Sequence, residues 1–128
     1  MESLELSAHI PASPERVYEA WIHPERHAAM TGGAANGESG EGGAFTAWDG
    51  YITGRFLELS PPGRIVMAWR TAEFPDDAPH SRVEIGLVAE GAGTRLTLSH
   101  TDIPKGQGER YRTGWDNFYF QPMIRHFT

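Results

Sequence analysis

The most regular hydrophobic pattern in the chain lies near its C-terminal end, over residues 109–127. Large apolar residues recur there every three or four positions, which is the spacing of one face of an α-helix. The residues on this face are Tyr111, Trp115, Phe118, Tyr119, Met123, Ile124 and Phe127. Because each buried aromatic side chain removes roughly 150–250 Å² from water, we expect this helix to hold a sheet against it. The face is either part of a filled core or one wall of a cavity.

Two residues depart from the helical pattern. Gly114 costs about 1 kcal/mol relative to alanine in a helix interior, and we interpret it as a place where another backbone comes close. Pro122 removes one backbone hydrogen bond, which predicts that the helix kinks or that its regular part ends there.

Alternation of apolar and polar residues predicts a β-strand over residues 4–10, which ends at Pro11. Ser13-Pro14-Glu15 is then typical of a helix start, with a hydroxyl N-cap, proline at the first helical position and an acid in the first turn. His23-Pro24-Glu25 ends this helix and begins a second, short one that runs to about Met30.

Five further strands are predicted before the last helix, over residues 45–48, 51–59, 65–69, 83–87 and 94–100. The first two flank Asp49-Gly50, which is favoured in two-residue hairpin turns. The glycine-rich residues 31–43 match no phosphate-binding motif, so we expect a flexible surface loop. One strand, two helices, five strands and a long helix predict a single α+β domain over residues 1–128, with an antiparallel sheet and its helices on one face.

Composition narrows the possible partners and locations. A chain of 128 residues is one domain by length, and its formal net charge of −6 argues against nucleic acid or an anionic membrane as the main partner. The absence of cysteine excludes disulfides, thiolate catalysis and sulfur-ligated metals. The first residues do not resemble a signal peptide and no apolar run reaches membrane-spanning length, so we expect a cytoplasmic protein.

Three histidines are candidates for chemistry. His100 lies two residues after Leu98 and four after Leu96, so it is on the same, inward face of the predicted strand. It is either a buried histidine whose hydrogen bonds are made within the protein or a polar group that lines a pocket. His23 and His27 are four residues apart, a spacing that can clamp a metal on one helical face. No third ligand is evident near them, so no metal is expected.

The remaining polar residues form no convincing catalytic set. The carboxylates do not make a recognisable acid/base pair, and the G-x-S-x-G nucleophile motif is absent. Arg70 should face the opposite side of the sheet from Trp69, where an exposed salt bridge is expected. We therefore predict no cofactor and no catalytic residue.

Several short motifs in succession resemble a known family. Residues 13–25 are similar to the opening of the START-like, helix-grip superfamily (SRPBCC, the birch-pollen-allergen fold). More narrowly, the chain resembles the family of activators of the heat-shock-protein-90 ATPase, in particular the C-terminal domain of its eukaryotic co-chaperones. This second resemblance rests on Met30-Thr31-Gly32, Gly42 to Phe45, Trp48 to Gly54, Ile65 to Arg70, Thr94 to Leu98, Ile103-Pro104 and Gly114-Trp115.

The resemblance covers nearly the whole chain and implies a helix-grip fold, in which a curved antiparallel sheet of about six strands surrounds the long C-terminal helix, with a cavity between them. In the co-chaperones a separate N-terminal domain contributes much of the chaperone binding and ATPase stimulation, and these 128 residues contain no counterpart of it. Other members of the superfamily bind hydrophobic small molecules, and some are cyclases or hydratases. The fold alone therefore does not determine the function.

Three functions stay open at this point. The first is a non-enzymatic binding domain that holds a hydrophobic or aromatic small molecule, oriented by His100 or a tyrosine hydroxyl. The second is a co-chaperone-like stress protein that binds a heat-shock-protein-90 homologue through an exposed patch including Arg70 or the glycine-rich loop. The third is a cyclase- or hydratase-like enzyme, for which His100 is the one candidate acid or base. For the first function, the predicted lining is Phe45, Trp69, Leu98, His100, Tyr111, Trp115, Phe118 and Tyr119.

Overall fold

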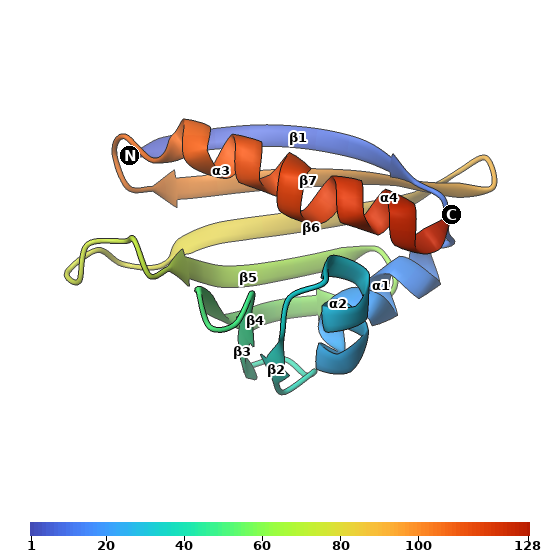
Figure 1. Cartoon of the computed structure of the whole chain (residues 1–128), viewed down its shortest axis with the longest axis horizontal. Coiled ribbons are helices and arrows are strands. Elements are labelled where there is room, and N and C mark those ends of the chain that lie inside the picture. The colour runs from blue at the N-terminus through green and yellow to red at the C-terminus, as the bar shows by residue number, and fades with distance from the viewer.

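A seven-stranded antiparallel sheet with the strand order β1-β7-β6-β5-β4-β3-β2 forms the frame of the structure, a computed structural model that describes residues 1–128. Figure 1 shows the long C-terminal helix running along the sheet, with the two short helices beside its C-terminal end. No helix is both long and apolar enough to cross a membrane. The strands are β1 (Glu2–Ile10), β2 (Asn36–Gly37), β3 (Ala44–Ala47), β4 (Ile52–Ser60), β5 (Arg64–Thr71), β6 (Ser81–Glu90) and β7 (Gly93–Ile103).

The predicted α+β helix-grip architecture is confirmed, with one strand more than expected. The additional strand is β2, which lies within the glycine-rich segment and pairs with β3 through Asn36↔Thr46 and Gly37↔Phe45. A Cβ atom at Gly37 would lie 2.4 Å from the carbonyl oxygen of Ala44, so glycine is required for this close pairing. The prediction of a loop throughout residues 31–43 was therefore wrong at this edge of the sheet.

The two short helices begin and end as their sequence predicts. In α1 (Pro14–Ile22) the Ser13 side chain accepts a hydrogen bond from the Arg16 backbone N–H at 3.3 Å, as expected of a serine N-cap. The second helix, α2 (Pro24–Thr31), ends at Gly32 in the left-handed conformation, with φ of 91°.

The β3–β4 hairpin has a longer loop than the Asp49-Gly50 dipeptide predicts. Its strands last pair at Ala47↔Ile52, which leaves four residues, Trp48 to Tyr51, in the loop. Trp48 and Asp49 have φ values of 50° and 59°, and Gly50 has φ of 88°. Because three consecutive residues have positive φ, Trp48 and Tyr51 lie outside the strand ladder.

The C-terminal helix is continuous but changes its geometry once. It consists of α3 (Gly108–Trp115), the π-helical turn η1 (Asp116–Phe120) and α4 (Gln121–Phe127). The N–H of Gln121 bonds to the carbonyl of Asp116, five residues back, which widens the helix just before Pro122. Proline has no N–H and its ring would meet the carbonyl four residues earlier in a regular α-helix, so a wider turn here accommodates it.

The π-helical turn changes which aromatic residues face the sheet. Phe120, which the regular spacing left out, is 3% exposed, whereas Phe118, which it predicted to point inward, is 55% exposed. The wide turn adds one residue to the helical repeat, so Phe120 replaces Phe118 on the buried face, while Met123 after the turn stays fully buried as predicted. The predicted burial of Phe118 was therefore wrong, and its exposed position becomes important at the functional site.

Two buried histidines attach the C-terminal helix to the rest of the fold. Trp115 donates its Nε1–H to Nδ1 of His100 at 3.1 Å, and Nε2 of His100 lies 2.8 Å from the hydroxyl of Ser81, which donates to the Trp69 carbonyl. Because Nδ1 of His100 accepts a hydrogen bond, Nε2 must carry the proton and donate it to Ser81. Of the two roles predicted for His100, the structure shows the satisfied buried histidine.

His27 on α2 makes an equivalent connection one helical turn farther along. Its Nδ1 lies 2.9 Å from the Trp21 carbonyl, to which it donates, so its Nε2 accepts the hydroxyl hydrogen of Tyr119 at 2.9 Å. The imidazole is also packed edge-on against Trp21, with ring centroids 5.3 Å apart. Both histidines are thus held neutral between a helix donor and a protein acceptor.

These histidines predict a loss of stability on mild acidification. Burial lowers the pKa of His27, and it lowers that of His100 to about 3. The unfolded chain therefore takes up these protons first, so stability is complete above the ordinary histidine pKa of about 6.5 and declines below it. Between pH 6.5 and 5, His100 alone lowers the free energy of unfolding by about 2 kcal/mol, and His27 lowers it further in the same direction.

This dependence is measured by urea unfolding, followed by tryptophan fluorescence, at closely spaced pH values from 8 to 5. The window lies above the ordinary carboxyl range, so acids contribute little. A His126→Gln variant, which changes an exposed histidine, should show the same slope. A free energy of unfolding that stays constant from pH 6.5 to 5 would contradict the neutral, buried state of both rings.

Candidate functional site: an aromatic cavity under the C-terminal helix

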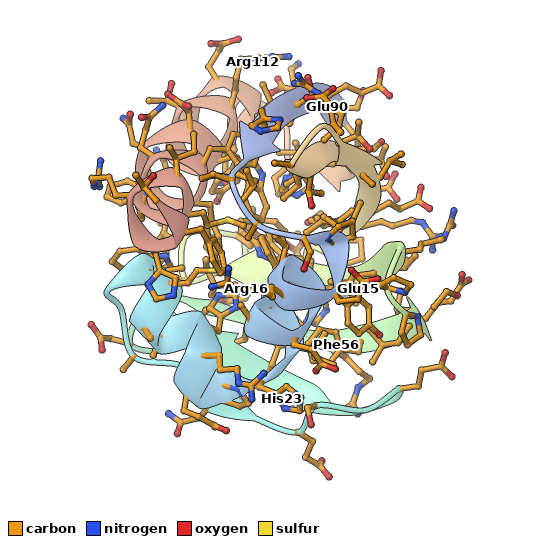
Figure 2. The ribbon with its side chains drawn as sticks, turned by 90° about the vertical axis from the view of Figure 1, so that its right-hand side faces the viewer. Glu15, Arg16, His23, Phe56, Glu90 and Arg112 are labelled. Carbon is orange, nitrogen blue, oxygen red and sulfur yellow. The ribbon has the colours of Figure 1, made fainter.

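A cavity of about 340 Å³ lies between the β3–β4 hairpin, β5 and the C-terminal helix. It opens to solvent beside Tyr51 and Phe118, which are 38% and 55% exposed. Figure 2 shows the C-terminal helix on one side and the strands on the other, with side chains filling most of the space between them. Its nine lining residues, all hydrophobic except Gly114, are Trp48, Tyr51, Ile52, Trp69, Tyr111, Gly114, Trp115, Phe118 and Tyr119.

The inner wall of the cavity is a packed aromatic cluster. Trp69 on β5 lies opposite Gly54 in the strand ladder and contacts Trp115 of the helix, with ring centroids 5.3 Å apart. Tyr119 packs on the other side of Trp115 at 4.9 Å. The polar atoms of Trp115 and Tyr119 bond to the two buried histidines, so these residues present mainly ring surface to the cavity.

Gly114 forms part of the helical wall without a structural requirement for glycine. Its φ is not positive, and a Cβ atom added there would meet only Cδ2 of Phe118, at 4.0 Å, which is ordinary van der Waals contact. The close approach of another backbone that we predicted for Gly114 is therefore wrong. The glycine instead leaves space in the cavity, and the helix accepts a cost of about 1 kcal/mol at this position.

The outer rim is formed by Trp48 and Phe118, whose rings meet edge to face with centroids 5.5 Å apart. Trp48 has φ of 50°, a rare conformation for a bulky residue, and its buried Nε1–H has no hydrogen-bond partner. Its indole packs directly on Gly33, where an added Cβ would lie 2.5 Å from Cε3 of the ring. The rim thus combines a strained backbone with an unpaired donor, features that cluster at functional sites.

The structure brings five of the eight predicted site residues to this cavity: Trp69, Tyr111, Trp115, Phe118 and Tyr119. The other three lie elsewhere. Leu98 and His100 are buried at 1% and 0% exposure in the core beneath the aromatic cluster, because an inward direction on the strand does not specify depth. Phe45 packs against Phe56 at 4.9 Å, in the neighbouring part of the sheet.

Sequence reasoning missed four lining positions: Trp48, Tyr51 and Ile52 at the hairpin, and Gly114 as a lining residue. The pair of aromatic residues directly flanking Asp49-Gly50 was the available signal. Large rings on both sides of a tight turn have no strand face to pack on, so they must pack against another element. Which element that is could not be deduced from the sequence.

A group of hydroxyls lies at the mouth of the cavity. Tyr51 donates a short hydrogen bond to Glu73, and Arg110 on α3 makes a salt bridge to the other Glu73 oxygen at 2.7 Å. Tyr111 lies 2.6 Å from both the Thr71 hydroxyl and Oε1 of Gln107. These contacts connect the hairpin, the end of β5 and the beginning of α3 around the opening.

The pKa values of these groups reflect burial and pairing. Burial and the bond to Glu73 raise the pKa of Tyr51 to about 12. Burial also raises the pKa of Tyr111, whereas the Tyr51 hydroxyl, together with Arg110, lowers the pKa of Glu73. At neutral pH the mouth therefore holds two neutral phenols beside an ionised carboxylate.

Other residues considered for chemistry have structural partners. Arg70 makes no salt bridge, contrary to prediction; its guanidinium donates to the carbonyls of Ala78 at 2.8 Å and Pro75 at 3.1 Å, which organises the loop after β5. Nε2 of His23 lies 2.7 Å from Glu19, whereas His27 points into the core, so the two histidines do not face a common point.

Comparison with known sequences relates the chain to one family. The family described as "Activator of Hsp90 ATPase homolog 1-like protein" matches residues 11–124. The human protein "Activator of 90 kDa heat shock protein ATPase homolog 1" is 31% identical over 115 residues, which are 90% of this chain and 34% of the human protein. The chain thus spans about a third of the length of the curated relatives it matches.

Solved structures show the same fold. An HSP90 activator from Plasmodium falciparum superposes with a TM-score of 0.80 and 26% identity, covering 92% of this chain and 91% of that one. CalU16 from Micromonospora echinospora superposes with a TM-score of 0.82 and 25% identity, covering 98% of this chain and 76% of that one.

Gly114 provides a direct test of the helical wall. We expect Gly114→Ala to raise the free energy of unfolding by about 1 kcal/mol, because alanine favours the helix and its methyl group meets no close neighbour. Urea unfolding followed by far-UV circular dichroism measures the change. A decrease in stability would show that the Cα of Gly114 is packed more closely than the geometry indicates.

Proposed function

The chain belongs to the family of activator of Hsp90 ATPase homologue 1-like proteins, and we propose that it is a binding domain that holds a hydrophobic or aromatic small molecule between the sheet and the C-terminal helix. The observation that carries this proposal is the cavity of about 340 Å³ with eight hydrophobic lining residues out of nine. Ligand pockets in proteins have roughly this size and composition, about 300–1,000 Å³ with mainly apolar and aromatic walls.

The size of the cavity supports an aromatic ligand of about two rings. An engineered apolar cavity of about 150 Å³ binds benzene, and the cavity here has more than twice that volume. The exposed edges of Tyr51 and Phe118 at the mouth leave a path for such a molecule to enter.

Two features around the cavity that lower the stability of the fold also support a binding role. Gly114 destabilises its helix by about 1 kcal/mol relative to alanine, and positive φ at Trp48 costs on the order of 1–3 kcal/mol. Departures of this kind from local rules tend to occur at functional sites.

We assign no catalytic step to the cavity. Both ring nitrogens of His100 bond to Trp115 and Ser81, and the hydroxyl of Tyr119 bonds to His27. The ring nitrogens of His100 have no free proton or lone pair, and the single hydroxyl hydrogen of Tyr119 is already donated to His27. The orientation of a ligand by His100, which we had considered from the sequence, is therefore replaced by orientation at the mouth.

Binding is tested by titrating ¹⁵N-labelled protein with 2-methylnaphthalene. Of the four tryptophans, Trp48, Trp69 and Trp115 line the cavity and Trp21 does not. We expect saturable shifts of the three cavity indole N–H signals and of the Gly114 amide, with a smaller effect at Trp21. The absence of saturable shifts would overturn the proposal for this class of ligand.

Matched leucine substitutions locate the binding site. Gly114→Leu places a side chain in the cavity and should weaken binding by about tenfold or more. The leucine covers apolar cavity surface that the ligand would otherwise bury, a loss of about 1.4 kcal/mol of binding free energy. Thr113→Leu adds the same side chain at the preceding, exposed position and should leave affinity unchanged. Equal affinities in the two variants would place the binding elsewhere.

A second candidate function is surface binding to a heat-shock-protein-90 homologue. It is supported by the family membership and by the similarity to the Plasmodium falciparum HSP90 activator over 91% of that chain. Arg70 no longer belongs to the proposed contact patch, because its guanidinium is bonded to the loop after β5. The exposed part of the glycine-rich segment, residues 38–42, remains available.

The two functions give different NMR results. Titration with the heat-shock-protein-90 homologue from the same source should shift amides of residues 38–42 and leave the cavity indoles unchanged. Serum albumin at the same concentration serves as the control. No shifts, or the same shifts with albumin, would contradict surface recognition of the chaperone.

A further inference from the structure

For each hydroxyl at the cavity mouth, the acceptor of its hydrogen can be identified. Tyr51 must donate to Glu73, because an ionised carboxylate has no hydrogen to give. The other carboxylate oxygen of Glu73 is occupied by Arg110 at 2.7 Å. The single hydrogen of Tyr51 is therefore used, while lone-pair capacity remains on its oxygen.

The neighbouring hydroxyls are also assigned. Nε2 of Gln107 donates to the Glu73 backbone carbonyl at 2.9 Å, which fixes the orientation of the amide and makes Oε1 the acceptor that faces Tyr111. Tyr111 thus donates to Gln107, and Thr71 donates to Tyr111 at 2.6 Å. The Thr71 oxygen in turn accepts the Glu73 backbone N–H at 3.2 Å.

The result is a mouth that offers acceptors and no free hydroxyl donors. All three hydroxyl hydrogens of Tyr51, Thr71 and Tyr111 are directed to protein oxygens. Of these three residues, Tyr51 and Tyr111 line the cavity, and Tyr51 is the more exposed at 38%. A molecule in the cavity that carries a hydrogen-bond donor can donate to the lone pairs of the Tyr51 oxygen, whereas a molecule without a donor leaves them unpaired.

We propose, building on the small-molecule binding function above, that the ligand is a neutral aromatic compound with a hydrogen-bond donor, a phenol in its simplest form, whose hydroxyl donates to the oxygen of Tyr51. Its ring system lies among Trp69, Trp115 and Tyr119. Acceptor-only groups such as ethers bring lone pair against lone pair at the Tyr51 oxygen, and the unpaired Nε1–H of Trp48 at the rim is buried. Anionic groups are repelled by Glu73 and by the net charge of −6.

Three probes of similar shape separate these possibilities by calorimetric titration: 2-naphthol, which has a donor, 2-methoxynaphthalene, which has only an acceptor, and 2-methylnaphthalene, which has neither. We expect 2-naphthol to bind about tenfold more tightly than the other two, as one additional hydrogen bond would give. A purely hydrophobic cavity would show the opposite order, because the methyl compound is the more apolar.

The Tyr51→Phe variant tests the assigned acceptor. It keeps the ring and removes the oxygen, so the preference for 2-naphthol over 2-methylnaphthalene should disappear. Tyr18→Phe is the matched control, since Tyr18 is the one tyrosine outside the cavity lining, and it should retain the preference.

The outcomes distinguish this inference from the proposed function. Equal affinity for 2-naphthol and 2-methylnaphthalene, or an unchanged preference in Tyr51→Phe, overturns the donor requirement and leaves small-molecule binding intact. Tight binding of 2-methoxynaphthalene likewise overturns it. If none of the three probes binds, both the inference and the proposed function fail.

Discussion

The packing of the C-terminal helix against the sheet depends on two neutral imidazoles buried in an otherwise apolar layer. The helix brings two polar groups into that layer, the indole N–H of Trp115 and the hydroxyl of Tyr119, and each would destabilise the fold without an acceptor. His100 from β7 and His27 from α2 supply the acceptors. Each imidazole then gives its own hydrogen to the protein, through Ser81 or directly to a carbonyl.

This arrangement also determines the chemical character of the cavity. Since Trp115 and Tyr119 direct their polar atoms toward the histidines, the surfaces they leave to the cavity are aromatic faces. The polar groups that remain accessible lie at the mouth, where Tyr51 and Tyr111 are bonded to Glu73, Thr71 and Gln107. The cavity therefore has an apolar interior and a hydrogen-bonding entrance, an arrangement suited to an amphipathic aromatic molecule.

The rim of the cavity follows from two local irregularities in distant parts of the chain. The π-helical turn before Pro122 moves Phe118 out of the core, and the run of positive φ values in the β3–β4 hairpin moves Trp48 out of its strand. The two rings meet edge to face at 5.5 Å, with Gly33 providing space for the indole. A regular helix with a two-residue hairpin would give neither contact, so the irregular geometry is part of the site.

The sequence by itself determined the order and type of the elements other than the short strand β2, because a period of two along strands and of 3.6 along helices is a local property of the chain. It also placed Trp69, Tyr111, Trp115 and Tyr119 correctly, since they occupy regular strand or helix positions on the inward face. The tertiary structure decided the exchange of Phe118 for Phe120, because the i→i−5 hydrogen bond forms only where the packed helix accommodates Pro122. It also decided that the rings beside Asp49-Gly50 line the cavity whereas inward-pointing His100 lies beneath it, because depth and partner choice depend on which elements meet across the core.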